Sequence, residues 1–136
     1  MKFENMRKIT EIIIHCTATK EGQNYTVEDI RRWHIERGFN DCGYHLVVRL
    51  DGAIELGRPI QTVGAHCIGH NSSSIGIAYV GGLDEHGRPK DTRTAAQKLS
   101  LSFLVQLLRK AYSESKVYGH YAFSNKACPC YDVDEL

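Results

Sequence analysis

Residues 9–16 read ITEIIIHC, a stretch typical of the central strand of a sheet. Its first six residues are mostly β-branched and apolar, which predicts a strand over residues 9–14 that is buried on both faces. Successive side chains of a strand point to opposite faces, so His15 shares a face with Ile13 while Cys16 lies on the other. Such a strand is typical of the centre of a sheet that is covered on both sides.

Helices and strands alternate on the C-terminal side of this stretch. Capping residues and apolar periodicity predict two helices. The first has about eleven residues between an N-cap at Thr26 and a stop at Gly38, and the second begins at a capping box at Thr94 and continues to Tyr112. Further strands are predicted at residues 44–50, 53–56, 75–80 and 116–119. Residues 57–74 and the tail after Gly119 lack periodicity and are predicted to be irregular. The sequence therefore predicts an α/β fold, a single domain over residues 1–136 with a mixed central β-sheet flanked by helices.

The composition is that of an ordinary globular domain, with 42% hydrophobic and 24% charged residues among 136. Lys and Arg number 17 and Asp and Glu 16, so a net charge of +1 argues against nucleic-acid binding. No apolar run approaches the roughly 18 residues of a membrane span, so we expect no membrane insertion. The N-terminal residues lack the apolar core and cleavage site of a signal peptide, which predicts synthesis in the cytoplasm.

Three residues at the ends of predicted elements are candidate metal ligands. His15 ends the first strand, His120 follows the last strand, and Cys128 lies eight residues further on. Two histidines and one cysteine suit a catalytic zinc site, in which the fourth coordination position is left to water. Two alternatives stay open at this point. His15 could be a core histidine bonded to the backbone, and Cys128 with Cys130 could belong to a structural four-ligand site.

Two further side chains are candidates for catalysis beside such a metal. Lys126 precedes Cys128 by two residues, so both project to one side if the tail is extended there. An ammonium group suits the negative charge that develops on a substrate oxygen. Tyr44 follows Gly43 at the start of a predicted strand, where its phenol could donate a hydrogen bond into the site. Alternatively, Lys126 is a solvated loop residue and Tyr44 covers the edge of the core.

Most of the chain resembles the zinc amidases of the phage-lysozyme type, the N-acetylmuramoyl-L-alanine amidases. Their fold is shared with the peptidoglycan recognition proteins. The resemblance rests on stretches that occur in family order: IIIHCTATK (12–20), RRWHIERGF (31–39), GYHLVVRLDG (43–52), VGAHCIGHNSSSIGIAYVGG (63–82), TAAQ (94–97) and GHYAFSNKACPCYDV (119–133). No single stretch would be specific, but their order across nearly the whole chain is.

The resemblance implies that one Zn²⁺ per chain is bound by His15, His120 and Cys128. It also implies that Tyr44 and Lys126 are the catalytic pair, and that His66 and Asn71 line the groove for the substrate. The expected reaction is hydrolysis of the amide between N-acetylmuramic acid and L-alanine in peptidoglycan, as in a phage or prophage lysin. Recognition-only relatives typically lose the cysteine ligand, so its presence here favours an enzyme.

The same resemblance leaves two other functions open. One is a non-catalytic module that binds muropeptide, or a regulator of a protein partner such as a phage RNA polymerase. The other is a structural zinc domain that uses Cys130 together with Cys128. Cys130 occupies a position where relatives more often carry Ser or Gly, and it could compete as a ligand or oxidise with Cys128.

The expected partner of the enzyme is peptidoglycan, with the chain acting as a monomer. It would reach the cell wall after release by a partner pore or a secretion machine. His34 lies on the predicted first helix and is expected at the surface or at the rim of the groove.

Overall fold

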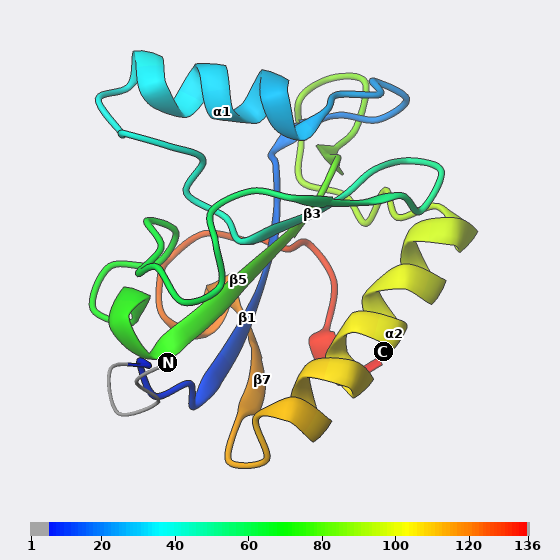
Figure 1. The fold of residues 1–136 in the computed structure, drawn as a ribbon. Coiled ribbons are helices and arrows are strands. Elements are labelled where there is room, and N and C mark those ends of the chain that lie inside the picture. Colours follow the sequence, from blue (N-terminus) through cyan, green and yellow to red (C-terminus); the bar gives the residue numbers. More distant parts are fainter. Residues whose placement is uncertain (1–5, 136) are drawn as a thin grey trace.

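The structure, a computed structural model, describes residues 6–135 and is built around a five-stranded sheet (Figure 1). The strands lie in the order β4 (Ile54–Leu56), β3 (Leu46–Val48), β5 (Ser74–Tyr79), β1 (Glu11–Cys16) and β7 (Lys116–Gly119). β1 pairs in parallel with β5 and β7, and β3 pairs in parallel with β5 but antiparallel with β4. The predicted mixed sheet is therefore confirmed.

β1 lies inside the sheet, and its three consecutive isoleucines, Ile12 to Ile14, are completely buried. The strand occupies residues 11–16 and not the predicted 9–14. His15 and Cys16 pair with Ala78 and Tyr79 of β5. The strand therefore continues for two residues beyond the isoleucine run. Both residues are thus held by a rigid central element.

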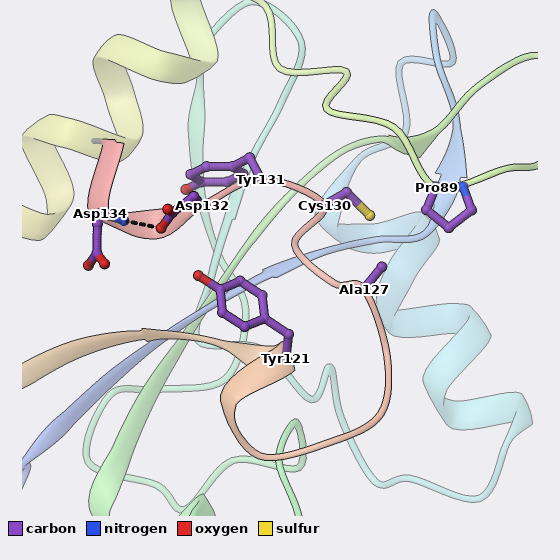
Figure 2. Close-up of a pocket in the computed structure, with 7 residues that line it drawn as sticks. All are labelled: Pro89, Tyr121, Ala127, Cys130, Tyr131, Asp132 and Asp134. Atoms are coloured by element: carbon purple, nitrogen blue, oxygen red, sulfur yellow. Dashed lines mark hydrogen bonds between the residues drawn. The ribbon is translucent and has the colours of Figure 1, made fainter.

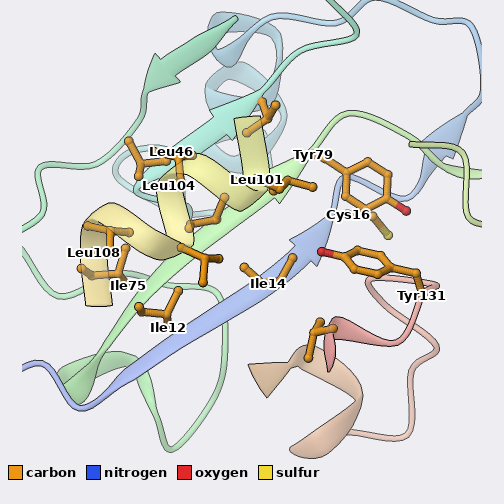
Figure 3. Close-up of a cluster of buried hydrophobic side chains, with 14 of the residues drawn as sticks. Ile12, Ile14, Cys16, Leu46, Ile75, Tyr79, Leu101, Leu104, Leu108 and Tyr131 are labelled. Atoms are coloured by element: carbon orange, nitrogen blue, oxygen red, sulfur yellow. The ribbon is translucent and has the colours of Figure 1, made fainter. Parts of the chain in front are cut away.

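The two helices cover opposite faces of the sheet. α2 (Ala95–Ala111) packs its buried leucines against Ile12 and Ile14 of β1 (Figure 3). α1 (Val27–Glu36) contributes Val27 and Ile30 to a second buried cluster on the other face. Each helix begins with the predicted capping box, formed by Thr26 with Asp29 in α1 and by Thr94 with Gln97 in α2.

The irregular segments contain one pairing that the sequence pattern does not predict. The two-residue strands β2 (Thr19–Lys20) and β6 (Gly82–Leu83) pair in parallel as a separate small sheet. Short 3₁₀ turns occur at η2 (Asn71–Ser73), η3 (His120–Ala122) and η4 (Val133–Glu135). Within residues 6–135, none of the helices has the length and hydropathy to cross a membrane.

Candidate metal centre and active site

The three candidate ligands meet at one edge of the sheet. Because β1 and β7 are parallel, His15 near the end of β1 and His120 directly after β7 lie at the same edge. The tail loop returns to this edge with Cys128. The ligand atoms of the three residues all lie within 4.8 Å of one another. The backbone N–H of Cys16 donates a hydrogen bond to the Cys128 sulfur at 3.1 Å, which holds the tail loop against β1.

The surroundings favour the protonation states that bind a metal ion. His15 is only 2% exposed, and burial together with the neighbouring His66 and His120 holds its pKa well below the usual range. Burial also lowers the pKa of His120, with a further contribution from the charge of Lys126. A hydrogen bond with the Cys16 side chain lowers the pKa of the Cys128 thiol. Neutral imidazoles and a thiolate are the forms that ligate metals.

Tyr44 and Lys126 line the same cleft, which has a volume of about 620 Å³ and also contains the three candidate ligands. The Tyr44 ring lies 5.2 Å from the His15 ring, measured between centroids. Burial raises the pKa of Tyr44, so its phenol is a hydrogen-bond donor at neutral pH. Lys126 is exposed at the cleft surface. None of the described residues that line the cleft is an Asp or a Glu, so its charged groups are cationic.

His66 and Asn71, the predicted groove residues, also line the cleft, but both are tied into the protein. Nδ1 of His66 lies 2.8 Å from Nε2 of His15, and its Nε2 lies 3.1 Å from Oγ of Ser74. The side-chain oxygen of Asn71 accepts hydrogen bonds from the backbone N–H groups of His66 and Cys67. Burial lowers the pKa of His66 to about 3. His66 therefore lies directly against a candidate metal ligand.

His34 differs from the expectation of a surface or rim position. It lines the cleft but is only 7% exposed, because it is on the side of α1 that faces the sheet. Its Nδ1 accepts a hydrogen bond from the backbone N–H of Gly43 at 2.8 Å, and burial lowers its pKa to about 4. His34 lies four residues after the buried Ile30, and this helical spacing is the sequence signal that places His34 on the buried face of the helix. The cleft residues Arg37 and Phe39, which follow the helix, carried no such signal.

The structure places the thiol of Cys130 outside the ligand cluster. Cys130 lines a different pocket together with Pro89, Tyr121 and Tyr131 (Figure 2). Among residues 6–135, the only group of histidine, cysteine or acidic side chains close enough to hold a metal ion is the one formed by His15, His120 and Cys128. All five cysteines are free thiols. The geometry therefore gives three ligands and not the four of a structural zinc site.

The fold and the site together define a small α/β enzyme domain with a candidate three-ligand metal centre at the end of its sheet. The profile of the N-acetylmuramoyl-L-alanine amidase family matches residues 5–131. The chain therefore belongs to this family, and both the resemblance and the enzyme class predicted from the sequence are confirmed.

Individual relatives agree with this assignment. The endolysin of Enterobacteria phage T3 is 46% identical over 129 residues, which cover 93% of this chain and 85% of the relative. The solved structure of the N-acetylmuramoyl-L-alanine amidase LysC from Clostridium intestinale has a TM-score of 0.81 and 30% identity, covering 96% of this chain and 83% of that one. The ectodomain complex of peptidoglycan recognition proteins LCa and LCx bound to tracheal cytotoxin has a TM-score of 0.74 and 27% identity, covering 90% and 76%.

Proposed function

We propose that this chain is a zinc-dependent amidase that hydrolyses the bond between N-acetylmuramic acid and L-alanine in bacterial peptidoglycan. His15, His120 and Cys128 would hold one Zn²⁺ per chain. The observation that carries the proposal is the convergence of their ligand atoms within 4.8 Å in a cleft whose described lining residues include no Asp or Glu. Membership of the amidase family and the likeness to the phage T3 endolysin support the reaction and the substrate.

The donor set suits zinc. Two imidazole nitrogens and one thiolate are ligands that zinc binds readily, whereas magnesium and calcium prefer oxygen. Three protein ligands beside a cleft leave a coordination position for chemistry, as in catalytic zinc sites. When bound, the ion would supply a Lewis acid that polarises the amide carbonyl and lowers the pKa of water towards about 7.

Tyr44 and Lys126 would act on the carbonyl oxygen of the scissile amide. As the amide carbon becomes tetrahedral, negative charge develops on this oxygen. The phenol of Tyr44 is protonated at neutral pH, and burial raises its pKa further, so it can donate a hydrogen bond to the oxygen. The Lys126 ammonium adds a positive charge that no carboxylate among the described cleft residues neutralises. His66 and Asn71 would shape the groove beneath the peptide.

Residues 1–136 would form a single amidase domain that acts as a monomer. The chain would act on the cell wall after release by a partner pore or a secretion machine. The endolysin name of the phage T3 relative supports action on the cell wall.

The test is release of new alanine amino termini from purified peptidoglycan, with and without a zinc chelator and after zinc is restored. We expect release that chelation abolishes and zinc recovers. A chain that binds zinc and muropeptide without releasing alanine would instead be a recognition module. Inhibition of a phage RNA polymerase by such an inactive chain would favour the regulatory function. Unfolding on metal removal would indicate a structural zinc domain.

A further inference from the structure

The contacts of His66 connect the candidate ligand His15 to Ser74, a buried residue of β5. The His66 ring stands between His15 and Ser74, with Nδ1 directed at Nε2 of His15 and Nε2 directed at Oγ of Ser74. The distances are 2.8 Å and 3.1 Å, and the His15 and His66 rings are nearly perpendicular, at 89°. The hydroxyl belongs to a completely buried residue at the start of β5. These three side chains form a continuous hydrogen-bonded relay.

Two glycines make the space that the His66 ring occupies. A Cβ atom added to Gly76 would lie 2.6 Å from Cγ of His66, and one added to Gly64 would lie 2.8 Å from Cδ2. A side chain at either position would therefore collide with the His66 ring. Asn71 fixes the other end of the residue through the backbone N–H of His66. The surrounding loop and strand thus position the ring from several sides.

The direction of the relay follows from the chemistry of imidazole. A neutral ring has one N–H donor and one acceptor nitrogen. Since Nε2 of His15 faces His66, Nδ1 is the nitrogen left for a metal ion, and it needs a free lone pair. The proton of His15 is then on Nε2, and Nδ1 of His66 accepts it in a hydrogen bond. With Nδ1 of His15 on a metal ion, His66 would carry its own proton on Nε2, and this N–H would donate a hydrogen bond to the hydroxyl of Ser74.

We propose that His66 and Ser74 are positioning residues that fix the tautomer and ring orientation of His15, so that Nδ1 of His15 is presented to the metal ion. This inference rests on the proposed zinc site and assigns His66 a role beyond lining the groove. Hydrogen-bonded partners behind metal ligands commonly change metal affinity by about 10- to 100-fold when they are removed. The relay should therefore affect zinc binding in the absence of any substrate.

The experiment measures the zinc dissociation constant of metal-free protein by competition with a chromophoric chelator. His66→Leu and His66→Asn are a matched pair, because the two side chains have similar size and only Asn offers an acceptor near the position of Nδ1. We expect His66→Leu to weaken zinc binding by about 10- to 100-fold and His66→Asn to restore most of the loss. Thermal unfolding of the metal-free variants checks that they are folded.

A second pair tests the far end of the relay. Ser74→Ala removes the hydroxyl that accepts from His66, whereas Ser73→Ala removes a neighbouring hydroxyl that bonds to Glu11 instead. We expect weaker zinc binding in Ser74→Ala, by less than in His66→Leu, and no change in Ser73→Ala. If His66→Leu does not fold without metal, the difference in zinc affinity between Ser74→Ala and Ser73→Ala tests the proposal.

Several results would overturn the relay. Unchanged zinc affinity in His66→Leu, or equal losses in the Leu and Asn variants, would show that the acceptor nitrogen has no role in binding. Equal effects of Ser74→Ala and Ser73→Ala on zinc affinity would show that the Ser74 hydroxyl has no specific role in zinc binding. Failure of the unmodified chain to bind zinc would instead contradict the proposed zinc site itself, so the two failures are distinguishable.

Discussion

The backbone nitrogen of Cys16 donates a hydrogen bond to the sulfur of Cys128 across 3.1 Å. This bond joins the end of the central strand to the tail loop, 112 residues away in the sequence. His15 precedes Cys16 in the same strand, so one element fixes two of the three candidate ligands. The strand supplies the His15 imidazole directly and holds the Cys128 sulfur through the backbone N–H of Cys16.

Replacing this sulfur should empty the metal site. We expect Cys128→Ser to reduce the zinc content of the purified protein from one ion per chain to almost none, because the thiolate is the anionic ligand of the set. Alanine release from peptidoglycan should fall with it. Zinc content after dialysis and the release assay measure the two effects on the same preparation.

Cys130→Ser is the matched control, since its thiol lies two residues away but lines the other pocket (Figure 2). This variant should retain both zinc and activity. Loss of zinc from both serine variants would mean that Cys130 is a ligand, which would support the structural zinc site.

Substitution of Tyr44 or Lys126 should lower activity without loss of the bound metal ion. Tyr44→Phe removes only the phenol donor, and Lys126→Met removes only the charge from a side chain of similar length. Each should lower turnover by about 10²- to 10³-fold, the usual cost of losing one preorganised donor to a developing oxyanion. Turnover is measured by alanine release, and zinc content is measured in parallel.

Lys98→Met serves as a control for loss of a positive charge, because Lys98 is exposed on α2, away from the cleft residues. It should keep full turnover. Normal turnover in both Tyr44→Phe and Lys126→Met, with zinc bound, would contradict their assigned roles.

The starts of both helices and the presence of the central strand were predictable, because each has a local chemical signal. The capping boxes at Thr26 and Thr94 mark the starts of both helices, and the isoleucine run marks the central strand. The proximity of His15 and His120 follows from the parallel pairing of β1 with β7, which the predicted mixed sheet did not specify.

Other features depend on contacts that no local pattern records. The paired strands β2 and β6 have two residues each, too few to show a periodicity. His66 lies in the aperiodic segment 57–74, so its contact with His15 arises only when that loop folds back onto β5. Cys130 is adjacent in sequence to the ligand region yet faces another pocket, because its backbone adopts a left-handed conformation with φ of 71°.

The apolar side chains on the buried face of α2 pack against the sheet and should contribute much of the free energy of unfolding (Figure 3). Leu101 is completely buried against the sheet, whereas Leu99, two residues earlier on the same helix, is 74% exposed. Leu101→Ala should lower the free energy of unfolding by about 2–5 kcal/mol through lost burial and a residual cavity. Leu99→Ala should change it by less than about 0.5 kcal/mol. Urea unfolding of both variants makes the comparison, and equal losses would contradict the packing described for α2.

His34 predicts how stability depends on pH. Its pKa in the folded chain is about 4, against an ordinary value of 6.5, because burial and the charges of Arg37 and Arg58 disfavour the imidazolium. Between these values the unfolded chain binds a proton that the folded chain does not. The contribution of His34 is therefore fully present above pH 6.5 and declines as the pH falls towards 4.

The decline should approach about 1.4 kcal/mol per pH unit for this one residue. His34→Asn removes the titration but keeps an oxygen near the position of Nδ1, able to accept the hydrogen bond from the backbone N–H of Gly43. Urea unfolding of metal-free protein at pH 7.5, 6 and 5 measures the slope. We expect the variant to resemble the unmodified chain at pH 7.5 and to lose stability less steeply below pH 6.5. Parallel slopes for the two proteins would show that His34 titrates alike in the folded and unfolded states, and its buried acceptor role would then be wrong.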